Sequence, residues 1–305
     1  SVRADDDDDH DLARAALEQH KALPLAQILE QIRPRLGGRI VGIEFEQVQL
    51  QQGDSDSVIA GTGTFGSRTS GVGGASILLA ADRVIDKCRK VAAHKLEAAE
   101  EDIEFDDGGF TVAGTDRTMN LIDAAKAVQN FMTAPPGMEV GLSEWAAWSP
   151  PAPTFPNGCH ICEVEIDRDT GVLDIVRYVA VDDVGTVINP LLMIGQLHGG
   201  IVQGVGQATL ENVVWDRDSG QLVSGSFMDY TMPRADDLPS FEMEINEVPT
   251  PTNPMGVKGA GEAGCVGALP AVMNAIVDAL RPLGITTLDM PATPERVWRA
   301  MQEMH

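Results

Sequence analysis

Residues 256–264 read GVKGAGEAG, so one lysine and one glutamate lie on a backbone with almost no other side chains. Glycine has no Cβ atom, which lets such a loop approach another group closely. Glu262 could therefore be a solvated turn residue, or a base that the loop holds against a ligand. Lys258 could pair with Glu262 at the surface, but a surface pair does not require a bare loop. The glycines favour the ligand-binding interpretation.

Two further stretches are rich in glycine, GTGTFGSRTSG at 61–71 and GQLHGGIVQGVGQ at 195–207. We expect each to run into a helix, where backbone N–H groups and the helix dipole attract anions. Together the three stretches suit a long phosphate-bearing ligand, although glycine also marks tight packing. The chain has no GxxxxGK[ST] motif, and GVGQAT lacks the preceding strand of a dinucleotide fingerprint. The hypothesis of an unrelated nucleotide-binding module therefore rests on glycine content alone.

Hydrophobic spacing predicts the elements of the first half of the chain. Apolar residues step by three and four along 76–98, which is typical of an amphipathic helix. Residues 51–76 are rich in Gly, Ser and Thr, and loops of this length are often functional. The other expected elements are a helix at 25–36, a strand at 43–50, a hairpin at 103–113 and a helix at 121–131.

Alternating apolar and polar residues predict strands in the second half. DRDTG and DRDSG resemble the start of a calcium loop but lack its central glycine and closing glutamate, which favours hairpin turns. The expected strands are 160–167, 172–181, 212–216, 221–228 and 241–248. The expected helices are 190–210, broken or preceded by the glycine stretch, then 269–283 and 294–302. This order of strands and helices indicates a mixed α+β fold.

Three regions are expected along the 305 residues. Residues 1–24 contain DDDDDHD and form an acidic arm, because a block of like charge is usually solvated. A proline cluster at 133–158 marks a linker. The linker places a first lobe at 25–150 and a second lobe, which carries the glutamate loop, at 151–305.

Composition excludes several classes of function. The formal charge of −24 argues against a nucleic-acid partner and against binding to an anionic membrane. No apolar run approaches the ~18 residues that span a bilayer and no secretory signal is evident, so we expect a cytoplasmic protein. Cys159 and Cys162 have CxxC spacing, but on a strand they point to opposite faces, and no second ligand pair is spaced for a metal. Structural thiols are the favoured interpretation.

Three segments resemble the molybdenum hydroxylase family, which includes xanthine oxidase and the aldehyde oxidoreductases. They are GDSDSVIAGTGTFGSRTS (53–70), FPNGCHICEVEIDRDTGVLDIVRYVAVDDVGTVINPLLMIGQLHGGIVQGVGQATLE (155–211), and DYTMPRADDLPSFE followed by TNPMGVKGAGEAG (229–264). Their order and spacing agree with the family from about residue 25 to the C-terminus. The chain is most similar to the bacterial branch that resembles the large subunit of carbon monoxide dehydrogenase, and to its C-terminal half.

The resemblance implies an α+β molybdopterin-binding domain with two lobes. It also implies a molybdenum–pterin cofactor, in the molybdopterin cytosine dinucleotide form used in bacteria, with Glu262 as the active-site base. By the same resemblance, ten residues contact the cofactor: Gly66, Ser67, Arg68, Thr69, Ser70, Asp183, Gln196, Lys258, Gly259 and Gly261. From the residues alone, Arg68 could be a surface salt-bridge partner, and Asp182 and Asp183 could cap a turn. His198 is better interpreted as structural than as a ligand.

The implied reaction is hydroxylation of an aldehyde or N-heterocycle with water-derived oxygen. Electrons would pass to [2Fe-2S] clusters and FAD on partner chains. A family molybdenum subunit is more than twice as long, so the expected partners are a chain with the N-terminal, molybdenum-binding half, an iron–sulfur subunit and a flavin subunit. The missing half carries the substrate-side loops. The alternative is a non-catalytic relic or assembly subunit of such a complex.

Overall fold

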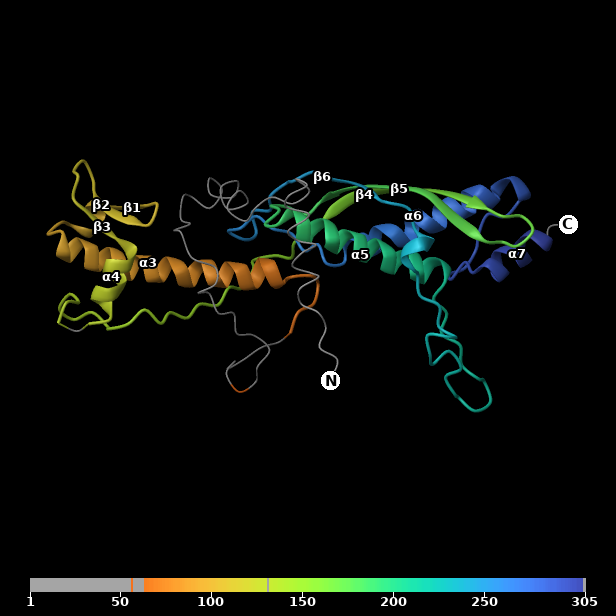
Figure 1. The fold of residues 1–305 in the computed structure, drawn as a ribbon, viewed down its shortest axis with the longest axis horizontal. Helices are drawn as coiled ribbons and strands as arrows, with labels where there is room; N and C mark the ends of the chain where they lie inside the picture. Colours follow the sequence, from red (N-terminus) through yellow and green to blue (C-terminus); the bar gives the residue numbers. More distant parts are fainter. Residues whose placement is uncertain (1–55, 57–62, 131, 304–305) are drawn as a thin grey trace. The chain divides into compact units, whose positions relative to one another are not determined.

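A computed structural model describes residue 56 and residues 63–130 and 132–303 (Figure 1). The chain divides into two compact units, and each is described by itself. Unit 2 comprises Gly66–Arg68, Ala152–Thr252 and Gly256–His305, and unit 1 comprises the rest. The predicted arm at 1–24, helix at 25–36 and strand at 43–50 lie outside the described residues.

Unit 1 combines a small antiparallel sheet with two helices. Its elements are η2 (Ser70–Gly74), α3 (Ala75–Lys95), η3 (Glu100–Asp102), β1 (Ile103–Asp106), β2 (Gly109–Val112), β3 (Thr118–Asn120) and α4 (Leu121–Val128). The strands pair in the order β1-β2-β3. Cys88 and Val91 of α3, Phe110 of β2 and Val128 of α4 are fully buried in one apolar cluster. The predicted helix at 76–98 and hairpin at 103–113 are confirmed, and the predicted helix at 121–131 ends at Val128.

Unit 2 places a three-stranded sheet against two long helices (Figure 1). Its elements are β4 (Asn157–Ile166), β5 (Leu173–Asp183), α5 (Pro190–Thr209), η4 (Ala235–Asp237), β6 (Glu242–Ile245), α6 (Ala263–Leu280), η5 (Arg281–Leu283) and α7 (Pro294–Gln302). β4 and β5 are antiparallel, and β6 joins β5 in parallel. Ile175, Tyr178 and Ala180 of β5 are buried in one core with Val272 and Ile276 of α6. Helices and sheets in both units confirm the predicted α+β class.

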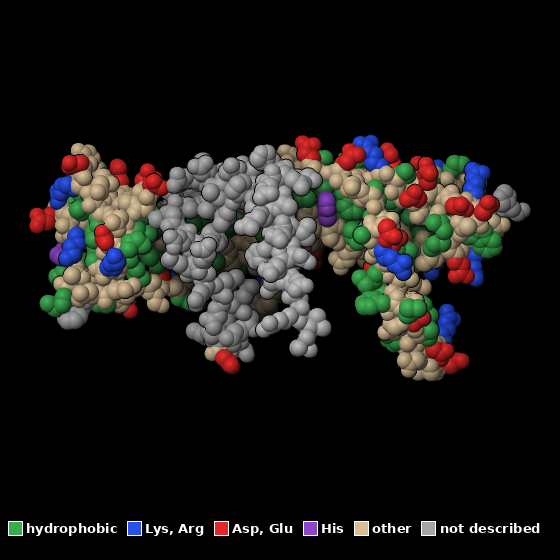
Figure 2. Space-filling view, in the orientation of Figure 1, with side chains coloured by type: hydrophobic (Ala, Val, Ile, Leu, Met, Phe, Trp, Pro, Cys, Tyr) green, Lys and Arg blue, Asp and Glu red, His purple; other side chains and the backbone are tan. Residues whose placement is uncertain are grey.

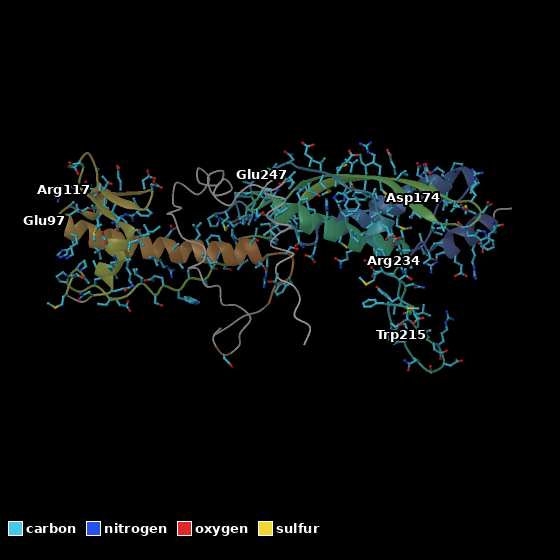
Figure 3. All side chains as sticks on the ribbon, viewed as in Figure 1. Glu97, Arg117, Asp174, Trp215, Arg234 and Glu247 are labelled. Atoms are coloured by element: carbon cyan, nitrogen blue, oxygen red, sulfur yellow. The ribbon has the colours of Figure 1, made fainter. Side chains whose placement is uncertain are left out.

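The predicted strands at 160–167, 172–181 and 241–248 are confirmed, and so is the helix at 294–302. DRDTG is a hairpin turn, in which the Asp167 carboxylate accepts the N–H groups of Asp169 and Thr170 at 2.8 and 2.9 Å. The predicted strands at 212–216 and 221–228 are wrong, because that segment of the described chain has only an isolated bridge between Trp215 and Leu222. This segment extends away from the sheet (Figures 1 and 3), and a two-stranded ribbon without a neighbouring strand is marginal.

The glycine stretch at 195–207 lies inside α5, so the prediction that it breaks or precedes this helix is wrong. The helix begins at Pro190 and is capped by Asn189, whose Oδ1 accepts the Leu192 N–H at 3.2 Å. Glycine inside a helix normally reduces stability. Here it permits close packing, because a Cβ at Gly204 would lie 2.9 Å from the carbonyl oxygen of Cys265 on α6.

The first turn of α6 also lies directly against α5. A Cβ at Gly264 would lie 2.5 Å from the Leu197 carbonyl oxygen and 2.8 Å from the Ile201 amide nitrogen. Both are backbone atoms of a helix, so they cannot rotate aside as a side chain would. Only glycine at this position lets the two helices approach so closely.

By length and composition, Ala263–Leu283 is the one described helix that could span a membrane, in contrast to the expectation that no apolar run is long enough. Its buried residues recur every four positions, at Gly264, Ala268, Val272, Ile276 and Leu280. The last four of these pack in the core of unit 2. One face of the helix therefore packs in the core of unit 2.

The sequence has 46 Asp and Glu residues and 22 Lys and Arg residues. On the face shown in Figure 2, Lys and Arg side chains are scattered among more numerous Asp and Glu side chains and form no stripe. This distribution agrees with the formal charge of −24.

Replacing Gly264 by alanine tests the contact between α5 and α6. We expect the free energy of unfolding to fall by about 1–3 kcal/mol, because the added methyl group overpacks a backbone contact. Gly199→Ala on α5 is the matched control, since a Cβ there has no heavy atom within 4 Å. That variant should gain about 0.5–1 kcal/mol from helix propensity. Equal effects in denaturant titrations would contradict the close approach.

Candidate functional site

Glu262 lies at the amino-terminal end of α6, directly before the first helical residue. Unpaired N–H groups and the helix dipole make this end favourable for a carboxylate. The side chain is exposed, and its Oε2 accepts a hydrogen bond from Ser67 Oγ at 2.8 Å. The alternative in which Lys258 pairs with Glu262 does not hold, because Lys258 pairs with Asp183.

The glycine loop lies alongside the segment that follows β5. The Lys258 N–H donates to the Val184 carbonyl oxygen at 2.9 Å, and the Thr186 N–H donates to the Gly256 carbonyl oxygen at 3.0 Å. Gly185 between them has a φ of +70°, and a Cβ there would lie 2.3 Å from the Gly256 oxygen. A side chain at position 185 would therefore push the loop away from the end of β5.

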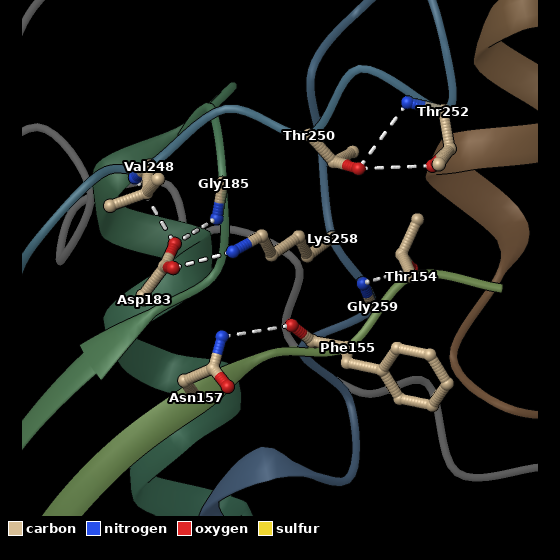
Figure 4. A network of polar contacts seen from close by, with 10 residues as sticks. All are labelled: Thr154, Phe155, Asn157, Asp183, Gly185, Val248, Thr250, Thr252, Lys258 and Gly259. Atoms are coloured by element: carbon tan, nitrogen blue, oxygen red, sulfur yellow. Dashed lines mark hydrogen bonds and ion pairs between the residues drawn. The ribbon is translucent and has the colours of Figure 1, made fainter.

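Asp183 and Lys258 form an ion pair beside this loop (Figure 4). Lys258 Nζ lies 2.5 Å from Asp183 Oδ2, and the Lys258 and Asp183 side chains are 10% and 12% exposed. Asp183 Oδ1 accepts the N–H groups of Gly185 and Val248 at 2.9 and 3.1 Å. Burial alone would raise the pKa of Asp183, but these three hydrogen bonds and the Lys258 charge together hold it below its usual value. Asp183 thus fastens the glycine loop to the segments around β5.

Replacing Asp183 by asparagine removes the charge that pairs with Lys258. We expect the free energy of unfolding near neutral pH to fall by about 2 kcal/mol, between the values for exposed and buried pairs. The folded-state pKa is lowered, so this contribution is complete above the unfolded value of 3.8 and is lost as pH falls through the folded value. Denaturant titrations should show the difference between variant and wild type shrinking in acid.

The control for this prediction is Glu242→Gln, which removes an exposed ion pair with Arg177. Solvent screens that pair, so we expect a much smaller change in stability. If Asp183→Asn behaved like Glu242→Gln, or if its effect did not depend on pH, the ion pair would not be what fastens the loop.

A second loop lies against the glycine loop at Ser67. Gly66 and Ser67 have φ values of +61° and +52°. A Cβ at Gly259 would lie 2.9 Å from the Ser67 carbonyl oxygen and 3.0 Å from that of Gly66, and a Cβ at Gly261 would lie 3.1 Å from Ser67 Oγ. The absence of side chains at positions 259 and 261 is therefore what lets the two loops touch.

Gln196 and Thr154 adjoin the same two loops. Gln196 Nε2 donates a weak hydrogen bond to the Gly261 carbonyl oxygen at 3.4 Å, and the Gly259 N–H donates to Thr154 Oγ1 at 3.3 Å. Thr154 is not among the residues that the sequence identified. It lies in the proline cluster, where no pattern distinguished it from a linker residue.

Most of the predicted cofactor residues of unit 2 thus lie together. Arg68 directly follows Ser67, and the Asp183–Lys258 pair lies beside the group. The residues that contact one another are Gly66, Ser67, Gln196, Gly259, Gly261 and Glu262.

Two predicted residues, Thr69 and Ser70, belong to unit 1. Thr69 Oγ1 lies 2.7 Å from Thr64 Oγ1, and Ser70 begins the π-helical turn η2. Their assignment to the cofactor stays a prediction.

Open space adjoins several glycines of this group. Among the residues that the structure describes, a Cβ at Gly66, Gly195 or Gly199 would have no heavy atom within 4 Å. Gly195 and Gly199 lie four positions apart on α5, so they leave a bare strip on one side of the helix. Gln196, next to Gly195, reaches the Gly261 carbonyl oxygen. The site therefore offers bare backbone for a ligand close to an exposed carboxylate.

A buried polar cluster between the sheet and α6 escaped the sequence analysis. His160 Nδ1 lies 2.7 Å from Tyr178 Oη, and His160 Nε2 lies 3.2 Å from each carboxylate oxygen of Asp182. The His160 and Asp182 side chains are 4% and 3% exposed. A Cβ at Gly267 of α6 would lie 2.5 Å from the imidazole ring. Strand alternation places His160 on the same face of β4 as Cys162. This spacing was the sequence signal that could have identified the cluster.

Replacing His160 by leucine would leave the Asp182 carboxylate buried without its nitrogen donor. We expect the free energy of unfolding to fall by about 3–5 kcal/mol, as when one member of a buried pair is removed. His160→Gln retains an amide donor and should lose less. Equal losses in the two variants, measured by denaturant titration, would show that ring packing and not the polar contact matters.

The remaining His and Cys candidates are His198 and the four cysteines. His198 contacts the Phe241 ring edge to face, with ring centroids 5.3 Å apart. All four cysteines are free, and burial raises the pKa of Cys88 and Cys162 to about 11. In the part of the chain that the structure describes, no group of three or more His, Cys, Asp or Glu side chains is arranged to hold a metal ion.

Comparison with known proteins gives consistent matches. A family model described as a molybdopterin cofactor-binding domain matches residues 32–239. The chain is 40% identical to the carbon monoxide dehydrogenase large chain of Hydrogenophaga pseudoflava and 40% identical to the nicotine 6-hydroxylase large subunit of Paenarthrobacter nicotinovorans. Each match covers 86% of this chain and 32% of the relative.

The fold is also similar to a solved structure. Reconstituted CO dehydrogenase from Oligotropha carboxidovorans matches with a TM-score of 0.82 and 34% sequence identity, over 88% of this chain and 33% of that chain. The chain thus spans about a third of the length of the relatives it matches.

Proposed function

Because the chain belongs to the molybdenum hydroxylase family, we propose that it is the C-terminal molybdopterin-binding part of a molybdenum-dependent oxidoreductase. The observation that carries this proposal is the position of Glu262. An exposed carboxylate lies at a helix amino terminus, in a loop that two long-range contacts hold in place. We propose that Glu262 is the active-site base.

The residues present fit a molybdenum–pterin cofactor. The bare backbone at Gly66, Gly195 and Gly199 leaves room for a large ligand, and glycine-rich backbone suits its phosphate groups. When bound, the cofactor would supply the two-electron oxidation and the water-derived oxygen. The residues of unit 2 that would hold it are Gly66, Ser67, Arg68, Gln196, Gly259 and Gly261, with Asp183 and Lys258 beside them. We propose the cytosine dinucleotide form.

The side chain of Glu262 is arranged to accept a proton. Its Oε2 accepts the hydrogen bond from Ser67, and we propose Oε1 as the oxygen that accepts the proton. Lys258, whose charge could otherwise compete for this carboxylate, is paired with Asp183. Asp183 therefore engages Lys258, the other charged side chain of the glycine loop.

The substrate class is part of the proposal. The two curated relatives are equally similar, at 40% identity, and one of them is named for nicotine, an N-heterocycle. We propose an aldehyde or an N-heterocycle as the substrate class. The proposed partners are the remaining two thirds of a molybdenum subunit, an iron–sulfur subunit with [2Fe-2S] clusters and a flavin subunit with FAD.

Glu262→Gln tests the proposed function in the complex purified from the native host with its co-purifying chains. We expect kcat to fall about 10²–10⁴-fold, which is the usual contribution of a general base, while molybdenum per complex is unchanged. Glu165→Gln on the exposed face of β4 is the control and should retain wild-type kcat.

Two outcomes would contradict this proposal. A complex that contains no molybdenum would remove the proposed cofactor. A wild-type kcat in Glu262→Gln would favour the alternative, in which this chain is a relic or an assembly subunit.

A further inference from the structure

The hydrogen bond between Ser67 and Glu262 joins residues 195 positions apart in the sequence. Ser67 Oγ donates to Glu262 Oε2 at 2.8 Å. A glutamate side chain at the surface has three rotatable bonds and samples several rotamers. A hydrogen bond to one carboxylate oxygen therefore selects one orientation among them.

The backbone of Ser67 itself has an uncommon conformation. Its φ of +52° lies in the left-handed region, which residues other than glycine, asparagine and aspartate seldom occupy. Such a conformation persists where the neighbouring structure determines it, and these positions cluster at functional sites.

The neighbouring structure here is backbone. Gly259 lies so close that a Cβ on it would meet the carbonyl oxygens of Gly66 and Ser67 at 3.0 and 2.9 Å. The Ser67 loop is therefore positioned by its packing on the glycine loop, not by its own hydroxyl group. Removing the hydroxyl should leave the loop in place and free only the Glu262 carboxylate.

We propose that Ser67 is a positioning residue for Glu262, and this inference rests on the proposed function. Its hydroxyl group fixes the carboxylate through Oε2, so that Oε1 is directed toward the proton it accepts. This role differs from the contact with the cofactor that the family resemblance implies for Ser67. The positioning role acts on Glu262, a residue of the same chain. It predicts a loss of kcat without a loss of molybdenum.

Ser67→Gly separates this role from a structural one, because glycine removes the hydroxyl and also relieves the left-handed backbone. We expect the thermal midpoint of the complex to stay the same or rise. We expect kcat to fall about 10–100-fold, the fold-change that corresponds to a hydrogen bond to a charged group, with KM within about twofold. Molybdenum per complex should not change. Ser67→Ala should show the same loss of kcat.

The matched control is Ser226→Ala, which removes a serine–carboxylate hydrogen bond of the same length, 2.8 Å, between Ser226 and Asp229 in an exposed turn. It should leave kcat unchanged.

A measurement that does not depend on turnover is the infrared difference spectrum between the wild-type complex and the Ser67→Gly complex. When Glu262 is present, Ser67→Gly should shift a carboxylate band. When the same substitution is made in a Glu262→Gln complex, that shift should be absent.

Each alternative outcome overturns the inference in a distinct way. A wild-type kcat in Ser67→Gly, beside an impaired Glu262→Gln, would refute positioning while the proposed function stands. Loss of molybdenum in Ser67→Gly would assign the fall in kcat to loss of the cofactor and not to the orientation of Glu262. A wild-type kcat in Glu262→Gln would refute the proposed function, and Ser67 would then have no base to position.

Discussion

The backbone contact between α5 and the first turn of α6 is the constraint on which the candidate site depends. Gly264 has no room for a side chain between the two helices, and Gly204 repeats the contact further along α5. This contact fixes where α6 begins, and Glu262 is the residue directly before that point. The proposed base is therefore placed by the helix packing of unit 2, and the loop before it is fastened separately by Asp183 and Lys258.

Glycine has two different tasks in this chain. At Gly185, Gly259 and Gly264 it permits backbone segments to touch, and a Cβ would meet another atom closer than 3.0 Å. At Gly66 and Gly195 it leaves open space instead. The sequence shows the same residue type in both cases, so glycine content could point to this region but could not distinguish packing from ligand binding.

Local patterns predicted the fold well because the elements of both units follow their hydrophobic periodicity. The helix at 76–98 and the paired strands around DRDTG are examples. The errors have physical causes. The glycines of 195–207 looked like loop residues because their stabilising contact with α6 lies outside the local sequence, and the predicted strands around DRDSG had no neighbouring strand to pair with.

The candidate site was less predictable, since its decisive contacts are long-range. Ser67 meets Glu262 across 195 positions, and Lys258 meets Asp183 across 75. No periodicity encodes such pairs. The family resemblance identified Ser67, Asp183, Lys258 and Glu262, but not that they pair in this way, and it gave no sign of the buried His160 cluster.

The central claim is that Glu262 is the base beside a molybdenum–pterin cofactor held on unit 2. The most direct measurement is an experimental structure of the complex isolated from the native host with its cofactor. We expect the Glu262 carboxylate next to the molybdenum, with Ser67 still hydrogen-bonded to it. A cofactor bound elsewhere, or Glu262 turned away from the metal, would show that Glu262 is not the base.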